Sequence, residues 1–129
     1  MQIQNPTISG SLYTTGQSYQ GFTTVVVSAS QTAATINFNN GNFQQLSLTG
    51  STVYSLTCSL TNFKAGASYC VLTIQSPFST SLCFSSTLGF VLYSSGTLPV
   101  WSTVSNEKDI LSLVCDGSNL YGVLATQFK

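Results

Sequence analysis

Short runs of apolar and β-branched residues recur along the chain from residue 22 onward and indicate β-strands. Turn-forming residues separate them at a spacing of roughly 8–12 residues, which is typical of sandwiches and barrels. In residues 54–60 every second residue is apolar, and the residues between are Ser or Thr. Because side chains alternate between the two faces of a strand, this pattern predicts a strand with one buried face. Residues 67–75 are apolar nearly throughout, which favours a strand in the middle of a sheet.

Two turn sequences predict hairpins between neighbouring strands. Asn-Asn-Gly at residues 39–41 follows the alternating run 34–38 and precedes residues 43–48. Asp116-Gly117 joins residues 110–115 to residues 120–126 in the same way. Asn, Asp and Gly tolerate the positive φ that a two-residue hairpin turn requires. Residues 82–84 and 88–93 are expected to form a further strand pair.

The fold class follows from these patterns and from what is missing. No window has a helical period, and residues 105–109 favour a loop over a helical turn. No internal repeat is evident, which argues against a β-helix or a propeller. We therefore expect an all-β domain over residues 22–129, an antiparallel two-sheet β-sandwich of jelly-roll type with about nine or ten strands. Residues 1–21 contain Asn5-Pro6 and three glycines and are expected to form an N-terminal arm or attachment segment, or else a frayed terminus.

The low charge narrows the classes of partner. Only 5% of the residues are charged, against about 25% in typical soluble domains, and the formal net charge is zero. Three lysines and no arginine cannot make the basic surface that nucleic acid or an anionic membrane requires. The apolar runs are far shorter than the roughly 20 residues of a membrane helix, so no membrane insertion is expected. A surface of Ser, Thr, Asn and Gln has little charge repulsion, which favours self-association.

The residue inventory does not favour catalysis or a cofactor. The chain has no His, so a Ser-His or Cys-His nucleophile system cannot be built within it. The nearest cysteines are twelve residues apart, unlike the close pairs of zinc sites, and no EF-hand loop is present. Two of Glu107, Asp109 and Asp116 would suffice for glycoside hydrolysis, but Asp116 already has a turn role. We expect no enzyme activity, no metal and no cofactor.

The four cysteines are Cys58, Cys70, Cys83 and Cys115. Cys58 and Cys115 are in phase with apolar neighbours, and free cysteine packs as a small hydrophobe. The first residues lack the basic start and apolar core of a signal peptide, so buried thiols are favoured, with disulfides as the alternative.

Aromatic and amide side chains near the closing hairpin are the candidate ligand-binding residues. Trp101 follows Pro99 in a loop-like stretch, and Asn119 and Tyr121 lie just past the Asp116-Gly117 turn. Together with Tyr93 they form the candidate set. Aromatic rings stack on the apolar faces of sugars, although packing within sheets and interfaces is the alternative use of such rings.

Seven segments carry a family resemblance through their order and spacing. They are TINFNNG (35–41), QQLSL (44–48) before Gly50, YSL (54–56), AGASY (65–69), GTLP (96–99), DILSLV (109–114) and DGSNLYG (116–122). In this the chain, from about residue 34 to residue 128, resembles small β-rich domains of tail-fibre, appendage and decoration proteins of tailed bacteriophages and related large DNA viruses. Family members commonly place their Trp before the glycine-proline loop, whereas Trp101 follows Pro99. These domains also usually end much longer fibre proteins.

The resemblance implies a virion protein made in the host cytoplasm, a homotrimer displayed outside the capsid or tail. We expect a fibre- or spike-type head domain that binds a host-surface receptor or glycan and contacts other virion proteins through residues 1–21. The alternatives are a capsid decoration or cement protein without a host ligand and a cellular carbohydrate-binding module.

Overall fold

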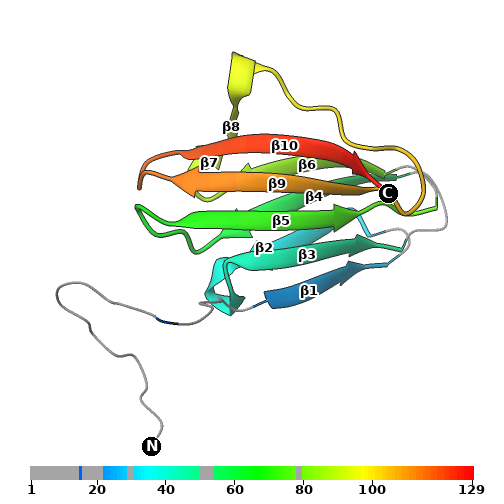
Figure 1. Cartoon of the computed structure of the whole chain (residues 1–129), viewed down its shortest axis with the longest axis horizontal. Coiled ribbons are helices and arrows are strands. Elements are labelled where there is room, and N and C mark those ends of the chain that lie inside the picture. Colours follow the sequence, from blue (N-terminus) through cyan, green and yellow to red (C-terminus); the bar gives the residue numbers. More distant parts are fainter. Residues whose placement is uncertain (1–14, 16–21, 29–30, 50–53, 78–79) are drawn as a thin grey trace, which may run out of the picture.

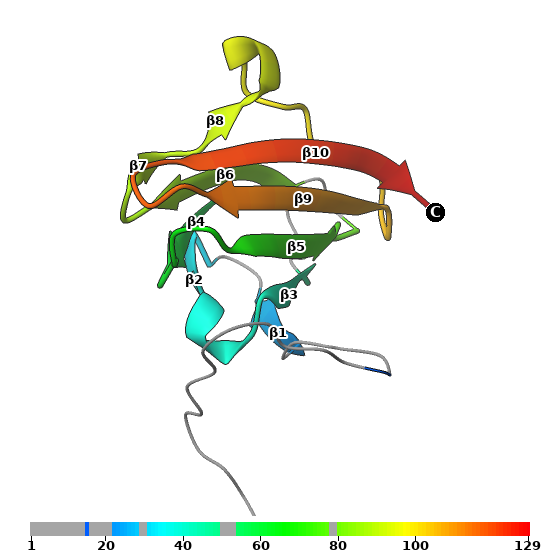
Figure 2. The same cartoon turned by 60° about the vertical axis from the view of Figure 1, so that its left-hand side comes forward.

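Two β-sheets face each other across one apolar core, as Figures 1 and 2 show. The computed structural model describes Thr15 and residues 22–28, 31–49, 54–77 and 80–129. These residues form ten strands and two short 3-10 turns, with no α-helix among them. The prediction of an all-β chain with about nine or ten strands is confirmed for this part of the sequence. The predicted N-terminal arm, residues 1–21, lies outside the described residues apart from Thr15.

The larger sheet has six strands in the order β1-β3-β5-β9-β10-β8. Its strands are β1 (Phe22–Val27), β3 (Phe43–Leu48), β5 (Ser68–Ile74), β9 (Lys108–Cys115), β10 (Leu120–Phe128) and β8 (Leu92–Tyr93). The smaller sheet has the order β2-β4-β6-β7. Its strands are β2 (Ala33–Asn37), β4 (Tyr54–Thr61), β6 (Thr80–Ser86) and β7 (Gly89–Phe90). The turns are η1 (Phe38–Asn40) and η2 (Ser94–Gly96).

From β1 to β6 the chain winds as a solenoid-like coil. Consecutive strands alternate between the two sheets, and each strand pairs in parallel with the strand of the next coil: β1 with β3, β3 with β5, β2 with β4 and β4 with β6. The antiparallel jelly-roll arrangement expected from the sequence is therefore wrong for these strands. The expectation that a missing repeat excludes a β-helix-like winding is wrong as well, since the inward positions of successive coils are apolar and in register although their sequences differ.

The Asn-Asn-Gly segment is a corner between the sheets and not the predicted hairpin. β2 pairs with β4, whereas β3 pairs with β1 and β5, so the strands flanking residues 39–41 lie in different sheets. The Asn37 side chain accepts a hydrogen bond from the Asn39 backbone N–H at 2.9 Å and so caps η1. Gly41 adopts a φ of 136°, which other residues rarely adopt. The same residues that favour a hairpin turn thus also suit a sharp corner.

The last strands close the six-stranded sheet with antiparallel pairing. β9 pairs with β5 on one side and with β10 on the other. The Asp116-Gly117 hairpin between β9 and β10 is confirmed: Asp116 Oδ1 accepts hydrogen bonds from the backbone N–H groups of Ser118 and Asn119 at 2.8 and 2.7 Å. The predicted pairing near residues 82–93 exists as a short contact of β6 with β7. β8 pairs in parallel with β10, and the segment from β8 through η2 protrudes beyond β10 in Figure 2.

The core is filled from alternating positions of both sheets. The strand predicted from residues 54–60 buries Leu56, Cys58 and Leu60, as expected, and residues 67–75 contribute the central strand β5. All four cysteines are free. Cys58 and Cys115 are buried as predicted, whereas Cys70 is half-buried and Cys83 is exposed, so burial of all four thiols is wrong.

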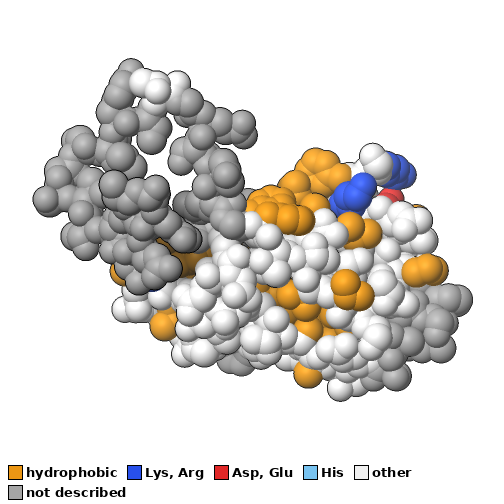
Figure 3. All heavy atoms as spheres, turned by 90° about the horizontal axis from the view of Figure 1, so that it is seen from below, with side chains coloured by type: hydrophobic (Ala, Val, Ile, Leu, Met, Phe, Trp, Pro, Cys, Tyr) orange, Lys and Arg blue, Asp and Glu red, His pale blue; other side chains and the backbone are white. Residues whose placement is uncertain are grey.

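The described surface is mostly uncharged. In Figure 3 polar side chains and backbone predominate, apolar side chains are scattered among them, and charged groups gather at one corner. No helix in the described residues has the length and hydropathy to cross a membrane.

Candidate functional site

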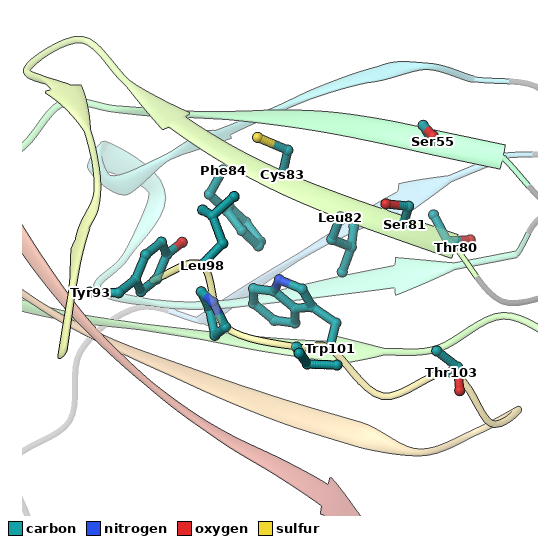
Figure 4. A pocket seen from close by; sticks show the side chains of 12 residues that line it. Ser55, Thr80, Ser81, Leu82, Cys83, Phe84, Tyr93, Leu98, Trp101 and Thr103 are labelled. Atoms are coloured by element: carbon teal, nitrogen blue, oxygen red, sulfur yellow. The ribbon is translucent and has the colours of Figure 1, made fainter. Parts of the chain in front are cut away.

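A groove lies between β6 and the loop formed by residues 97–103, which we call the Trp101 groove (Figure 4). Its volume is about 550 Å³. One wall comes from β6 and the other from the 97–103 loop, with Tyr93 of β8 at one end and Ser55 of β4 beside β6. The apolar and aromatic lining residues include Leu82, Phe84, Tyr93, Leu98, Pro99 and Trp101. The polar lining residues include Ser55, Thr80, Ser81 and Thr103.

Trp101 is held half-buried by packing against β6. Its ring lies 5.0 Å from the ring of Phe84, centroid to centroid, at an interplanar angle of 40°. Phe84 itself is buried in the core. One part of the indole is therefore anchored, and the rest faces the groove in Figure 4. The indole N–H makes no hydrogen bond to the described residues and is not fully buried, so this donor is available to a ligand.

A buried carboxylate fixes the 97–103 loop next to Trp101. Asp109 Oδ2 accepts a hydrogen bond from the Ser102 backbone N–H at 2.8 Å, and Asp109 Oδ1 accepts one from the Ser102 hydroxyl at 2.5 Å. Asp109 Oδ1 also accepts the backbone N–H of Gln127 at 3.1 Å. Hydrogen bonds to an ionised acceptor are about twice as strong as neutral ones. The conformation of the loop is therefore set by the core and not by solvent.

The Gln75 side chain ties the two walls of the groove together. Its Nε2 donates to the Ser102 carbonyl at 2.6 Å and to the Thr80 carbonyl at 3.2 Å. Its Oε1 accepts the Thr80 backbone N–H at 3.0 Å. Gln75 is buried, and these bonds join the start of β6 to the loop that carries Trp101. The groove is thus preorganised in the free protein.

Tyr93 enters the groove from β8 over a glycine. A Cβ atom at Gly122 would lie 2.9 Å from Val91 Cγ1 and 3.1 Å from Tyr93 Cε1, so a side chain at residue 122 would displace the tyrosine ring. Burial, with a smaller contribution from nearby Cys83, raises the pKa of Tyr93 to about 12. The phenol therefore stays neutral at physiological pH and can donate a hydrogen bond.

Two of the four predicted site residues, Trp101 and Tyr93, lie together in the groove, and the other two lie elsewhere. Tyr121 precedes Gly122 in β10, and because neighbouring side chains in a strand alternate faces, it points away from the core. Its hydroxyl donates to Asp116 Oδ2 at 2.9 Å, and Asn119 lies in the same hairpin turn. The predicted patch of four residues is therefore divided between two surfaces.

The negative charge of Asp116 is stabilised by groups of its own hairpin turn. Backbone N–H groups of Asn119 and Ser118, with the Tyr121 hydroxyl, lower the pKa of Asp116 below its usual range. The hydrogen bond to Asp116 and its negative charge raise the pKa of Tyr121. Both groups are exposed, so these contacts organise the turn but do not form an enclosed site.

The three carboxylates are spread over different settings. Asp109 accepts hydrogen bonds from the 97–103 loop, and Asp116 accepts hydrogen bonds within the hairpin turn. The carboxylate of buried Glu107 lies 3.6 Å from Lys129 Nζ. Within the described residues no group of three His, Cys, Asp or Glu side chains is placed to hold a metal ion.

Sequence reasoning missed the β6 wall of the groove, above all Leu82, Phe84 and Cys83. The alternation in residues 80–86 was a signal for a strand, but no local signal says which loop packs beside it. Comparisons with family models, with curated proteins and with solved structures found no match to this chain.

Proposed function

We propose that this protein is a non-enzymatic structural protein on the exterior of a virus particle, a fibre- or spike-type head domain that binds a host-surface glycan through the Trp101 groove. The observation that carries the binding proposal is the placement of Trp101 and Tyr93 beside uncharged hydroxyl side chains in a preorganised groove. The virion assignment is supported by the resemblance over residues 34–128 and by the nearly uncharged composition.

A glycan suits the chemistry of this groove better than an ionic ligand does. The indole face offers an apolar surface for the C–H face of a sugar ring. Hydroxyl groups of Ser81, Thr103 and Tyr93 offer donors and acceptors, and none of them has a hydrogen-bond partner among the described residues. No charged side chain lines the groove in the described part of the chain. A volume of about 550 Å³ matches the size of common small-ligand sites.

The resemblance also supports assembly of the protein on the particle. The protein forms a homotrimer, is made in the host cytoplasm, and attaches to other virion proteins through residues 1–21. Low charge supports self-association because identical copies then repel one another little.

Two alternatives have their own support. A capsid decoration or cement protein without a host ligand is favoured by exposed apolar side chains on the six-stranded sheet, such as Phe22 and Val123, which suit contact with another protein. A cellular carbohydrate-binding module is supported by the groove alone, and this alternative does not require the protein to be part of a virus particle.

A glycan array tests the binding proposal with three proteins. Wild type is expected to bind a limited set of glycans, and Trp101→Ala is expected to lose at least about tenfold in affinity. Tyr121→Ala is the matched aromatic control, because it removes an exposed ring outside the groove, and it should bind as wild type does. Thermal unfolding of each variant separates loss of binding from loss of fold. Absence of binding to any glycan or host cell would favour the cement alternative, and loss of binding in Tyr121→Ala alone would place the site at the hairpin.

A further inference from the structure

The side chains of the six-stranded sheet that point away from the core form a broad apolar surface, which we call the outer face. Of the twelve large apolar side chains that are exposed in the described residues, eight lie on this face, among them Phe22, Phe43, Val114 and Val123. The other four belong to the turn after β6 and to residues 98–104. Monomeric proteins rarely concentrate exposed apolar side chains in this way.

Strand register places these side chains in continuous rows. One row runs across five strands through Phe22, Phe43, Cys70, Ser112 and Val123. The rings of Phe22 and Phe43 are in contact across the strand pair, with centroids 5.3 Å apart.

The next row along the strands contains two further apolar residues of the central strands, Leu72 and Ile110, which pair directly. The apolar surface therefore extends along the strands as well as across them.

The outer face is also nearly free of charge. Lys108 is the one charged side chain among the outward positions of the described strands of this sheet, and it lies at the start of β9. An apolar surface without charge suits an identical surface, because no buried ion has to be paired when two copies meet.

The size of the face is sufficient for a stable contact. Six strands about 4.8 Å apart and about six residues long cover roughly 600 Å² in projection. Side-chain relief raises the accessible area toward the roughly 800 Å² per partner that standard interfaces bury. The face also has a hollow of about 380 Å³, lined by Phe43, Cys70 and Val114 among others, into which a partner's side chain can insert.

We propose that the outer face is the surface through which copies of this chain associate. The occupant is a further copy of the same chain: in the proposed trimer the outer faces meet around a three-fold axis, so that one half of each face contacts the opposite half of its neighbour's. This inference rests on the self-association in the proposed function and adds the surface that mediates it. It does not depend on the glycan groove, which lies on the other side of β10 from Tyr121.

Two lysine substitutions in the full-length protein test the assignment. Val123→Lys places a charge on the outer face, on β10 next to the central strand β9, at a side chain that is 63% exposed, so the monomer fold tolerates it. Thr57→Lys places the same charge on the exposed side of β4 in the other sheet. We expect light scattering to give a trimer for wild type and for Thr57→Lys. For Val123→Lys we expect a dissociation constant at least about 100-fold higher, because the interface would bury an unpaired charge.

Native thiols provide a second measurement without further mutation. Cys70 lies on the outer face and Cys83 on the exposed side of the other sheet. In wild type a maleimide is expected to modify Cys83 and spare Cys70, and in monomeric Val123→Lys it should modify both. Continued protection of buried Cys58 shows that the variant is folded.

Each outcome decides a different part of the proposal. A Val123→Lys protein that remains as oligomeric as wild type, or equal labelling of Cys70 in both proteins, overturns the outer face as the interface. A wild-type dimer that Val123→Lys dissociates supports the interface and overturns the trimer. A monomeric wild type overturns both, while glycan binding by that monomer would still support the groove.

Discussion

Asp109 holds Ser102 with both of its carboxylate oxygens, at 2.8 Å to the backbone N–H and 2.5 Å to the hydroxyl. The contact joins the second residue of β9 to the loop residue that follows Trp101. Asp109, a candidate catalytic carboxylate by sequence, therefore has a structural role: it holds the loop that forms one wall of the groove.

Asp109→Asn is expected to destabilise the fold and weaken glycan binding together. The amide loses the charge, and its N–H₂ group faces a donor where the carboxylate accepted a hydrogen bond. The expected loss is about 2–4 kcal/mol in the free energy of unfolding, measured with urea. Asp116→Asn is the control, because that carboxylate is exposed in the hairpin, and its effect should be much smaller. Equal stability of Asp109→Asn and wild type would contradict this structural role of Asp109.

Gly122→Ala is expected to displace the Tyr93 ring that packs over residue 122. The added Cβ would lie 2.9 Å from Val91 Cγ1 and 3.1 Å from the tyrosine ring, closer than ordinary packing allows. We expect a loss of about 1–3 kcal/mol in unfolding free energy and weaker glycan binding. Thr126→Ala, an exposed change near the end of the same strand, should alter neither quantity. If Gly122→Ala binds and unfolds as wild type does, Tyr93 is not positioned through this contact.

Alkylation in the native state should modify Cys83 first and Cys58 last. Cys83 is exposed in the groove, whereas burial raises the pKa of Cys58 to about 12 and removes the reactive thiolate at neutral pH. Mass spectrometry after timed labelling gives the order. A bulky label on Cys83 is also expected to block glycan binding, and bound glycan should slow the labelling. Modification of Cys83 with full retention of binding would place the ligand outside the groove.

Asp116 is expected to titrate below the usual range for an aspartate. Its pKa is lowered in the folded protein, so its contribution to stability is fully present above the unfolded value of about 3.9 and is lost as pH falls through the folded value. An NMR titration of the carboxyl carbon measures this directly. In Asp116→Asn the pKa of Tyr121 should fall toward its usual value of about 10, because the hydrogen bond and the negative charge that raise it are gone. An unchanged tyrosine titration would contradict the contact.

Sequence patterns predicted which residues form strands and which faces are buried, but apart from the β9–β10 hairpin and the short β6–β7 contact they did not predict which strands pair. Leu56, Cys58 and Leu60 are buried because alternation reports the two faces of a strand. Alternation carries no information about the partner strand, so parallel coils and antiparallel hairpins produce the same pattern. The Asn-Asn-Gly corner illustrates this, since the positive φ of Gly41 serves either connection.

The candidate site was predicted in part for a similar reason. Trp101 and Tyr93 meet because the chain returns past β10 after β8, a consequence of tertiary packing. Asn119 and Tyr121 were placed with them by closeness in sequence. Tyr121 and Gly122 are neighbours in the chain but face opposite sides of the sheet. Tyr93 therefore packs over Gly122 on one side, whereas Tyr121 contacts Asp116 on the other.

The winding of β1 to β6 has a consequence for how the chain reaches its final form during synthesis. Each coil strand pairs with one that emerges from the ribosome soon afterwards, as Phe22 does with Phe43 and Tyr54 with Thr80. Coils can therefore stack one at a time in the order in which they are made. β5 must wait longer for its second neighbour, because Ser68 pairs with Val114. A nascent chain that stops before residue 108 would leave one side of β5 without its partner strand, so completion of the six-stranded sheet is deferred until β9 and β10 have been translated.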